Sequence, residues 1–173
     1  IPTWSGARLV PGELYAYNQP SEPGRISVNA EEITPVMEKG FAVLERTWKA
    51  GDRVVLELPM PVKASLCDAR VEANRGRVAF SRGPLVLCAE GADNGEPVQR
   101  FQVDPSAAAA GAKQDWFESG VLAGIPRVTL AAFEQAEDEL QSSRLVLIPY
   151  YAWSNRDQGS MLTWIPVVNE AGS

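Results

Sequence analysis

Short apolar segments separated by Gly, Pro and Asn turns dominate this chain, and helical periodicity is scarce. Residues 25–29 alternate polar and apolar side chains as a half-buried strand does, residues 98–103 predict a further strand, and residues 145–148 form a short apolar run. Many short strands at turn-punctuated spacing are typical of antiparallel all-β domains. The pattern therefore predicts an all-β fold, an antiparallel β-sandwich of jelly-roll-like type.

A hairpin is predicted between residues 41–48 and 53–60, two apolar-rich runs on either side of the turn 49–52. Gly51 lies in that turn, where a positive φ is favourable. Alternate residues from Val54 to Met60 are apolar. This alternation predicts that the second strand buries one face in a core.

The stretch 71–90 is predicted to organise the rest of the chain. Two apolar runs, 78–80 and 85–89, flank a bend at 81–84, where a Gly-Pro pair favours a turn. The sequence before this stretch alternates in the manner of a sheet, whereas polar turns and an alanine run follow it. We therefore expect the boundary between two β units here.

Two later segments leave alternatives open. The alanine run 107–110 has no apolar face beyond alanine, so a loop and a single helical turn are both compatible with it. Residues 128–133 have the character of a strand, but residues 134–140 contain enough Glu, Gln, Ala and Leu for a short helix. After the polar turn 154–160, residues 161–165 predict a closing strand.

Composition and charge exclude some classes of function. The chain has 173 residues, of which 45% are hydrophobic, and this is enough to bury a core. A net charge of -6 disfavours a nucleic-acid surface, because such a surface depends on Lys and Arg. No apolar run approaches the roughly 20 residues that a membrane-spanning helix needs. We expect neither a nucleic-acid partner nor a membrane partner.

The chain contains no histidine and two cysteines, Cys67 and Cys88. Without imidazole, Ser-His-Asp and Cys-His nucleophiles are excluded, and a zinc site would need Cys and carboxylates alone. Isolated thiols among apolar neighbours are typically buried and free, although an oxidising compartment would allow the two to pair.

Acid-base chemistry would fall to carboxylates, and four of them lie on or near predicted strands: Glu45, Glu57, Glu72 and Glu90. Charged residues that alternate with apolar ones usually form the solvated face of a sheet. We therefore predict that this chain contains no catalytic, cofactor-binding or metal-binding residue.

Aromatic residues gather near the C-terminus, where residues 149–156 are P-Y-Y-A-W-S-N-R. Aromatic and Arg side chains dominate interface energetics, although core packing explains aromatics as well. The candidate domain-interface or sugar-contact residues are Tyr150, Tyr151, Trp153, Asn155, Arg156, Arg75 and Trp4. If the chain binds sugar directly, Trp4, Trp116 and Trp153 are the candidates for a stacking platform.

The first residues, Ile1-Pro2-Thr3-Trp4, have the pattern of the end of a strand whose beginning is missing. We therefore expect the chain to be a piece of a longer protein. An open sheet edge near Ile1 would recruit another chain, which predicts a homo-oligomer formed through that edge.

Several separate motifs occur in an order that resembles one enzyme family. They are T-W-K-A-G-D at 47–52, L-P-M-P-V at 58–62, A-N-R-G-R-V-A at 73–79, R-G-P-L-V at 82–86 and I-P-Y-Y-A-W-S-N-R at 148–156. The chain is similar in these motifs to the C-terminal part of the β-L-arabinofuranosidase-like glycoside hydrolases, family 127. The resemblance covers most of the chain, from Ile1 to Pro166.

This resemblance implies an N-terminal (α/α)6 barrel that holds a cysteine nucleophile, a glutamate and a zinc bound by Cys and Glu, followed by two β-sandwich domains. None of the barrel motifs occurs in this chain, so zinc is expected only in the barrel. The resemblance also implies a nested layout: residues 1–80 and 144–168 form the first sandwich, residues 81–143 form a second, smaller sandwich inserted into it, and residues 169–173 are a tail.

Two functions follow as expectations. The first is a non-catalytic accessory region that packs on the catalytic barrel of its parent protein, a glycoside hydrolase. The second is an independent carbohydrate-binding module that uses surface Trp and Tyr side chains to bind an arabinose-containing carbohydrate. Hydrolysis by this chain alone is not expected.

Overall fold

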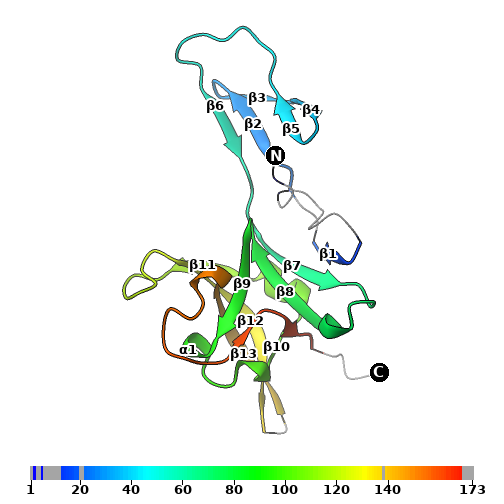
Figure 1. Ribbon diagram of the computed structural model, residues 1–173, viewed down its shortest axis with the longest axis vertical. Helices are drawn as coiled ribbons and strands as arrows, with labels where there is room; N and C mark the ends of the chain where they lie inside the picture. The colour runs from blue at the N-terminus through cyan, green and yellow to red at the C-terminus, as the bar shows by residue number, and fades with distance from the viewer. Residues whose placement is uncertain (1, 3–4, 6–12, 20–21, 138, 169–173) are drawn as a thin grey trace.

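The computed structural model describes residue 2, residue 5 and residues 13–19, 22–137 and 139–168. These residues form antiparallel sheets with a few short helices, which confirms the predicted all-β class. Two regions can be distinguished in the ribbon diagram (Figure 1). We call residues 25–57 the arm, and residues 13–19 together with 62–168 the body.

The body is built on one ten-stranded sheet in which β1, β7, β8, β9, β13, β12 and β10 follow one another in that order. Three short strands pair at its flanks: β11 with β12, β14 with β9 and β15 with β8. The bounds of these strands are β1 Tyr15–Tyr17, β7 Val62–Cys67, β8 Arg77–Arg82, β9 Leu85–Glu90, β10 Phe101–Gln102, β11 Lys113–Trp116, β12 Pro126–Ala136, β13 Glu139–Pro149, β14 Met161–Leu162 and β15 Ile165–Pro166.

Short helices connect the strands of the body. Helix α2 begins after Asp104, whose carboxylate accepts hydrogen bonds from the backbone N–H groups of Ser106 and Ala107, both at 2.9 Å. This cap selects the helical alternative for the alanine run. The helices are α1 Gly91–Asn94 and α2 Pro105–Ala110, and the 3-10 turns are η2 Glu72–Asn74, η3 Val98–Arg100 and η4 Tyr150–Ala152.

Side chains from both halves of the ten-stranded sheet pack into one main core. Phe80 of β8, Leu130 of β12 and Leu147 of β13 are almost fully buried in it. A smaller cluster on the other face of β9 and β13 contains Cys88 and Ile148. Because Leu147 and Ile148 are adjacent on one strand, they point to opposite faces and reach the two clusters.

The bend at 81–84 is confirmed. Arg82 and Leu85 are partners in the register of β8 and β9, and Gly83 between them has a φ of 55°. Residues 134–140, which the sequence left open, belong to the long hairpin of β12 and β13. The ten-stranded sheet joins strands from both sides of the predicted boundaries at 80 and 144, so the nested division into two sandwiches stays a prediction.

The arm contains two small sheets, and it extends away from the body along the long axis of the molecule (Figure 1). One sheet has the order β3, β2, β6, and the other pairs β4 with β5. The bounds are β2 Arg25–Val28, β3 Glu31–Ile33, β4 Val36–Glu38, β5 Phe41–Val43 and β6 Val54–Glu57. The predicted alternation in residues 25–29 is confirmed, because Ile26 and Val28 are buried.

The predicted hairpin of 41–48 with 53–60 is wrong. The turn itself forms, since the Asp52 N–H donates to the Lys49 carbonyl at 3.1 Å. The strands around it pair elsewhere: β5 with β4 across a tight turn at Lys39-Gly40, and β6 with β2. The nearer turn offered β5 a partner at lower loop-closure cost.

The expected burial of one face of 53–60 is wrong as well. Val54 is 48% exposed and Leu56 is 47% exposed, although both share a face with the buried Ile26 and Val28. The alternation therefore has the period of a strand, but the face is buried only at the central strand β2, at Ile26 and Val28, and the flanking strand β6 stays half exposed.

Candidate functional site

The end of β13 presents three aromatic side chains to solvent. Pro149 closes the strand, and the 3-10 turn η4 follows, held by a hydrogen bond from the Trp153 N–H to the Tyr150 carbonyl at 3.2 Å. The buried Ala152 anchors the turn in the smaller core cluster. Tyr150, Tyr151 and Trp153 remain 47%, 60% and 40% exposed, and we call these three residues the aromatic surface.

The aromatic surface has a fixed internal geometry. The rings of Tyr150 and Trp153 are stacked, with centroids 6.0 Å apart and planes inclined by 29°. Exposed aromatic rings with little conformational freedom are suited to contact another protein or a sugar ring.

A buried ion-pair network lies beneath this surface. Arg156 donates through Nη1 to Asp93 at 2.7 Å and through Nη2 to both Asp93 and Glu90. Glu90 also accepts the backbone N–H of Ser154 at 2.8 Å, and its side chain is 5% exposed. The network therefore ties the segment after η4 to the end of β9.

Arg156 is paired within the chain through its two Nη atoms, whereas its buried Nε has no hydrogen-bond partner among the described residues. Its hydrogen bonds to Asp93 and then to Glu90 hold the pKa of the guanidinium above its ordinary value, against the opposing effect of burial. The guanidinium also lies over the ring of Phe117, 5.4 Å from the centroid. Arg156 is thus placed to support the aromatic surface from below.

A second set of contacts holds the turn that follows β9. The Asn94 side chain donates to the Val146 carbonyl at 2.9 Å and accepts the Val146 N–H at 2.7 Å, as a paired strand would. Glu96 accepts the backbone N–H of Ser160 at 2.7 Å and also its hydroxyl. These Ser160 hydrogen bonds hold the pKa of Glu96 below its ordinary value.

The chain passes close to the Glu96 carboxylate at two glycines. A Cβ at Gly91 would lie 1.7 Å from the Glu96 Oε1, and one at Gly159 would lie 2.4 Å from the same atom. The two glycines let the backbone close around this carboxylate.

Beside Trp153 lies a pocket of about 260 Å³. Its lining includes Glu90 and, from the 154–160 turn, Asp157 and Gln158. An aromatic residue together with carboxylate and amide residues is the composition that suits neutral, hydroxyl-rich ligands.

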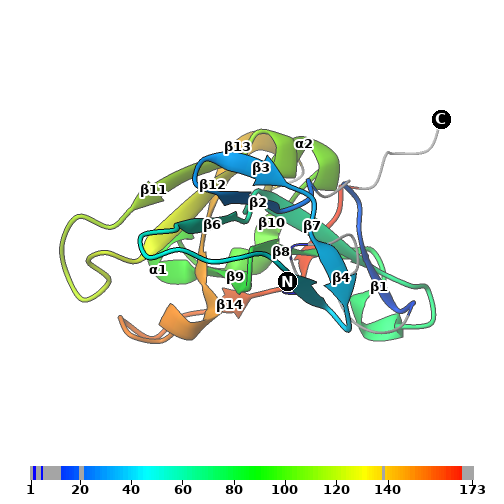
Figure 2. The same ribbon diagram turned by 90° about the horizontal axis from the view of Figure 1, so that it is seen from above.

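The other predicted contact residues lie apart from this surface or within its turn. Asn155 donates to the Ala152 carbonyl at 3.1 Å and so stabilises the turn. Arg75 follows η2 and donates to the Ala69 carbonyl at 3.0 Å; η2 and η4 lie on opposite sides of the body in both views (Figures 1 and 2). Trp4 lies outside the described residues.

Comparisons with known proteins give the family. The model of the glycoside hydrolase family 127 C-terminal domain matches residues 62–166, more than half of the chain. The chain belongs to glycoside hydrolase family 127.

Relatives of this family 127 chain are known as whole proteins. A non-reducing end β-L-arabinofuranosidase from Bifidobacterium longum subsp. longum is 33% identical over 152 residues, which are 79% of this chain and 23% of that protein. A solved family 127 β-arabinofuranosidase is 33% identical with a TM-score of 0.85, over 97% of this chain and 27% of that one.

A second solved structure, the family 127 β-L-arabinofuranosidase from Geobacillus stearothermophilus T6, is 30% identical with a TM-score of 0.76, over 85% of this chain and 25% of that one. The chain therefore spans about a quarter of the length of these relatives, which carry additional domains.

Sequence reasoning about this family 127 chain did not bring Asp93 and Arg156 together. It considered Glu90 as a possible acid and Arg156 as a possible contact, but it did not pair them. Glu90 and Arg156 are 66 residues apart in the sequence, and patterns within a few residues do not predict contacts over such a separation. The E-x-x-D spacing of Glu90 and Asp93, with both groups near a strand end, was the available signal.

The described residues do not fit the zinc site that the family implies. Among them, no group of three or more Cys, Asp and Glu side chains is arranged to hold a metal ion. Both cysteines are free, and burial, followed by the nearby Glu90 and Asp93 charges, raises the pKa of the Cys88 thiol to about 12. No helix in the described part of the chain is long and apolar enough to cross a membrane.

Proposed function

We propose that this chain is a non-catalytic β-sandwich accessory region of a family 127 hydrolase and that it packs on a catalytic (α/α)6 barrel. The observation that carries the proposal is coverage: the chain matches about a quarter of each relative, in the C-terminal domain. The hydrolase would act on β-L-arabinofuranosides, as the names of the relatives indicate, and its zinc would lie in the barrel.

The aromatic surface is the proposed contact with the barrel. Tyr and Trp bury large areas with little loss of side-chain freedom, which makes them frequent hot spots. The ion pairs of Arg156 and the smaller core cluster support the backbone of this surface from below. A surface that is ordered before binding loses less conformational entropy on binding.

The test is co-purification of the chain with the rest of the hydrolase polypeptide, produced separately. Trp153→Ala should raise the dissociation constant at least about tenfold. Trp116→Ala is the matched control, because Trp116 is also an exposed tryptophan of the body, 56% exposed, but lies on β11. No binding by the unmodified chain would refute the accessory function; equal affinity of the two variants would refute the assigned surface.

A carbohydrate-binding module is the second candidate, and the pocket beside Trp153 is the observation in its favour. Titration with an arabinose-containing oligosaccharide should then change the tryptophan fluorescence, and Trp153→Ala should abolish the change. A flat titration of the unmodified chain at millimolar ligand would exclude direct sugar binding.

Self-association through an open sheet edge also remains a proposal. Strand β1 ends the order of the ten-stranded sheet, and among the described residues it pairs with β7 alone. Light scattering should show a mass that grows with concentration, and a constant monomer mass would contradict the proposal.

A further inference from the structure

Helix α1 of the body ends at an asparagine that is followed by a glycine, Asn94-Gly95, and nowhere else in the sequence does a glycine follow an asparagine. The side-chain amide of an asparagine can react with the backbone nitrogen of the next residue. A glycine at that position hinders the attack least, because it has no side chain and the freest backbone. The pair is therefore the point of the chain most prone to lose an amide group.

This reaction consumes water and needs no cofactor. The Gly95 nitrogen gives its proton to solvent base and attacks the Cγ atom of Asn94, the side-chain nitrogen leaves as ammonia, and a succinimide ring forms. Water then opens the ring at one of its carbonyl groups, which leaves aspartate or isoaspartate at position 94. The net change converts an amide and water into a carboxyl group and ammonia.

In the folded chain, both reacting groups are hydrogen-bonded elsewhere. Asn94 donates through Nδ2 to the Glu90 and Val146 carbonyls, each at 2.9 Å, and its Oδ1 accepts the Val146 N–H at 2.7 Å. The Gly95 N–H donates to the Gly91 carbonyl at 2.7 Å. Ring closure would have to break these hydrogen bonds, because it turns the side chain of Asn94 back onto Gly95.

The hydrogen bonds of Asn94 continue the ten-stranded sheet. Strands β9 and β13 pair as far as Ala89 and Leu147, and Asn94 takes the next place beside Val146. Arg100 also holds the turn, since its Nη2 donates to the Asn94 carbonyl at 2.7 Å. Release of the Asn94 side chain therefore requires the junction of β9 and β13 to open.

The product does not fit the place that Asn94 occupies. A carboxylate accepts hydrogen bonds and cannot donate them, so an aspartate there would leave the Glu90 and Val146 carbonyl groups without a donor. Isoaspartate would also lengthen the backbone at the end of α1. The same helix contains Asp93, which binds Arg156 beneath the aromatic surface. The reaction would therefore weaken the body and the support of the aromatic surface together.

We propose that Asn94-Gly95 is a site of spontaneous deamidation, which the folded body keeps unreactive and which reacts when the junction of β9 and β13 opens. The observed rate is then the rate of the unfolded sequence multiplied by the fraction of open molecules. Because the product cannot restore the junction, an opened chain that reacts is altered irreversibly. This property of the body is independent of the proposed accessory function.

Peptide mass spectrometry of the 173-residue chain tests the rate. Trypsin releases residues 83–100, and fragment ions distinguish Asn94 from Gln99, the other amide side chain of this peptide. In mildly alkaline buffer, Asn94 should react at least about a hundredfold more slowly in the folded chain than in urea. The rate in urea should match that of the free peptide 83–100. Equal rates in the folded and the unfolded chain would overturn the proposal.

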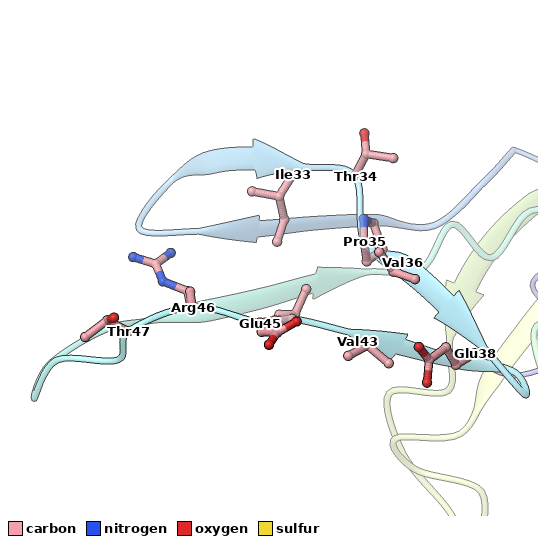
Figure 3. A pocket seen from close by; sticks show the side chains of 10 residues that line it. Ile33, Thr34, Pro35, Val36, Glu38, Val43, Glu45, Arg46 and Thr47 are labelled. Carbon is pink, nitrogen blue, oxygen red and sulfur yellow. The ribbon is translucent and has the colours of Figure 1, made fainter.

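Two matched substitutions test which region controls the reaction. Leu147→Ala weakens β13 beside Val146 and should raise the rate in the folded chain at least about tenfold. Leu56→Ala is the control, because it makes the same change in the arm, where Ile33 and Val43 line an open groove of about 550 Å³ (Figure 3). It should leave the rate unchanged. An equal rate in the two variants would show that the body does not control the site.

A third variant tests the consequence. Asn94→Asp reproduces one product and should lower the melting temperature by about 5 °C or more, because two carbonyl groups lose their donor. Asn74→Asp is the control: Asn74 is also half-buried, but only its backbone groups form hydrogen bonds with the described residues. It should melt within about 1 °C of the unmodified chain. Equal melting temperatures of the two variants would contradict the irreversible loss.

Discussion

Leu147 in the body and Leu56 in the arm both occupy apolar positions of strands, but Leu147 is fully buried and Leu56 is 47% exposed. The difference lies in what faces each strand. In the body, the strands on either side of Leu147 belong to a sheet whose two halves pack into one core. In the arm, the same face buries Ile26 and Val28 of the central strand β2, while Leu56 lies on the flanking strand β6 and stays half exposed.

The comparison shows that an apolar pattern predicts which side chains of a strand favour burial, but it does not predict which residues will cover them. In the body, other described residues bury Leu147 completely, whereas in the arm Leu56 stays half exposed. Burial of an alternating apolar strand therefore depends on its place in the sheet as well as on its pattern: the central strand of the arm is buried and the flanking strand is half exposed.

The largest effect is expected from the same substitution in the two regions. Leu147→Ala should lower the free energy of unfolding by about 3 kcal/mol, because it leaves a cavity in a packed core. Leu56→Ala should change it by less than about 0.5 kcal/mol in the isolated chain, since its site is half exposed. Urea denaturation measures both. Similar losses in the two variants would end the distinction between arm and body.

Loss of the buried ion pairs should come next. Arg156→Met leaves Glu90 and Asp93 unpaired in a mostly buried site and should cost about 2–3 kcal/mol; the residual 20% exposure of Arg156 reduces the penalty for a fully buried pair. Arg70→Met is the control, because the Arg70 pair with Asp68 is exposed. Urea denaturation of both variants should show a clear loss for Arg156→Met alone.

Acid should weaken the body through carboxyl groups whose pKa is lowered. Ser160 lowers the pKa of Glu96, and Arg100, followed by Ser143, lowers that of Glu134; the ordinary value for both is 4.5. A folded pKa below the unfolded one means that the stabilisation is complete above the unfolded value and is lost as the pH falls through the folded value.

The melting temperature should therefore be independent of pH near about pH 6 and should decrease when the pH is lowered below about 4. Glu96→Gln should flatten part of this decline because it removes the titrating carboxyl group. Ser160→Ala should flatten a smaller part, because it removes the hydroxyl hydrogen bond to Glu96 and keeps the one from the Ser160 backbone N–H. A decline identical to that of the unmodified chain in both variants would show that Glu96 contributes nothing.

The smallest effect concerns the two thiols. Cys88 is buried with its pKa raised to about 12, whereas Cys67 is half buried and donates to the Asn74 carbonyl at 3.1 Å. An alkylating reagent should label Cys67 in the native chain and both cysteines after unfolding. Cys67→Ser should abolish native labelling. Rapid native labelling of Cys88 would contradict its place in the smaller core cluster.

The local features of the fold could be predicted from the sequence. The bend at 81–84, the strand at 25–28 and the buried run 145–148 depend on glycine, proline and alternation within a few residues, and all three are confirmed. The exposed Tyr150, Tyr151 and Trp153 follow from a proline that ends a strand.

Features that depend on distant residues could not be predicted. Strand β5 pairs with β4 across the tight turn at Lys39-Gly40 and not with the segment after the turn at 49–52. The sequence does not distinguish the two turns, because each contains a glycine with positive φ. Residues 134–140 have helical composition, but they lie at the closed end of the long hairpin in which β12 pairs with β13. The partners of Arg156, Asp93 in α1 and Glu90 at the end of β9, are 63 and 66 residues away in the sequence.

Hydrogen exchange of the free, monomeric 173-residue chain tests the central distinction most directly. The account predicts that amides of β8, β9 and β13 exchange only through global unfolding, whereas those of β2 and β6 exchange orders of magnitude faster. Arm amides protected as strongly as those of the body, in a chain shown to be monomeric, would contradict it.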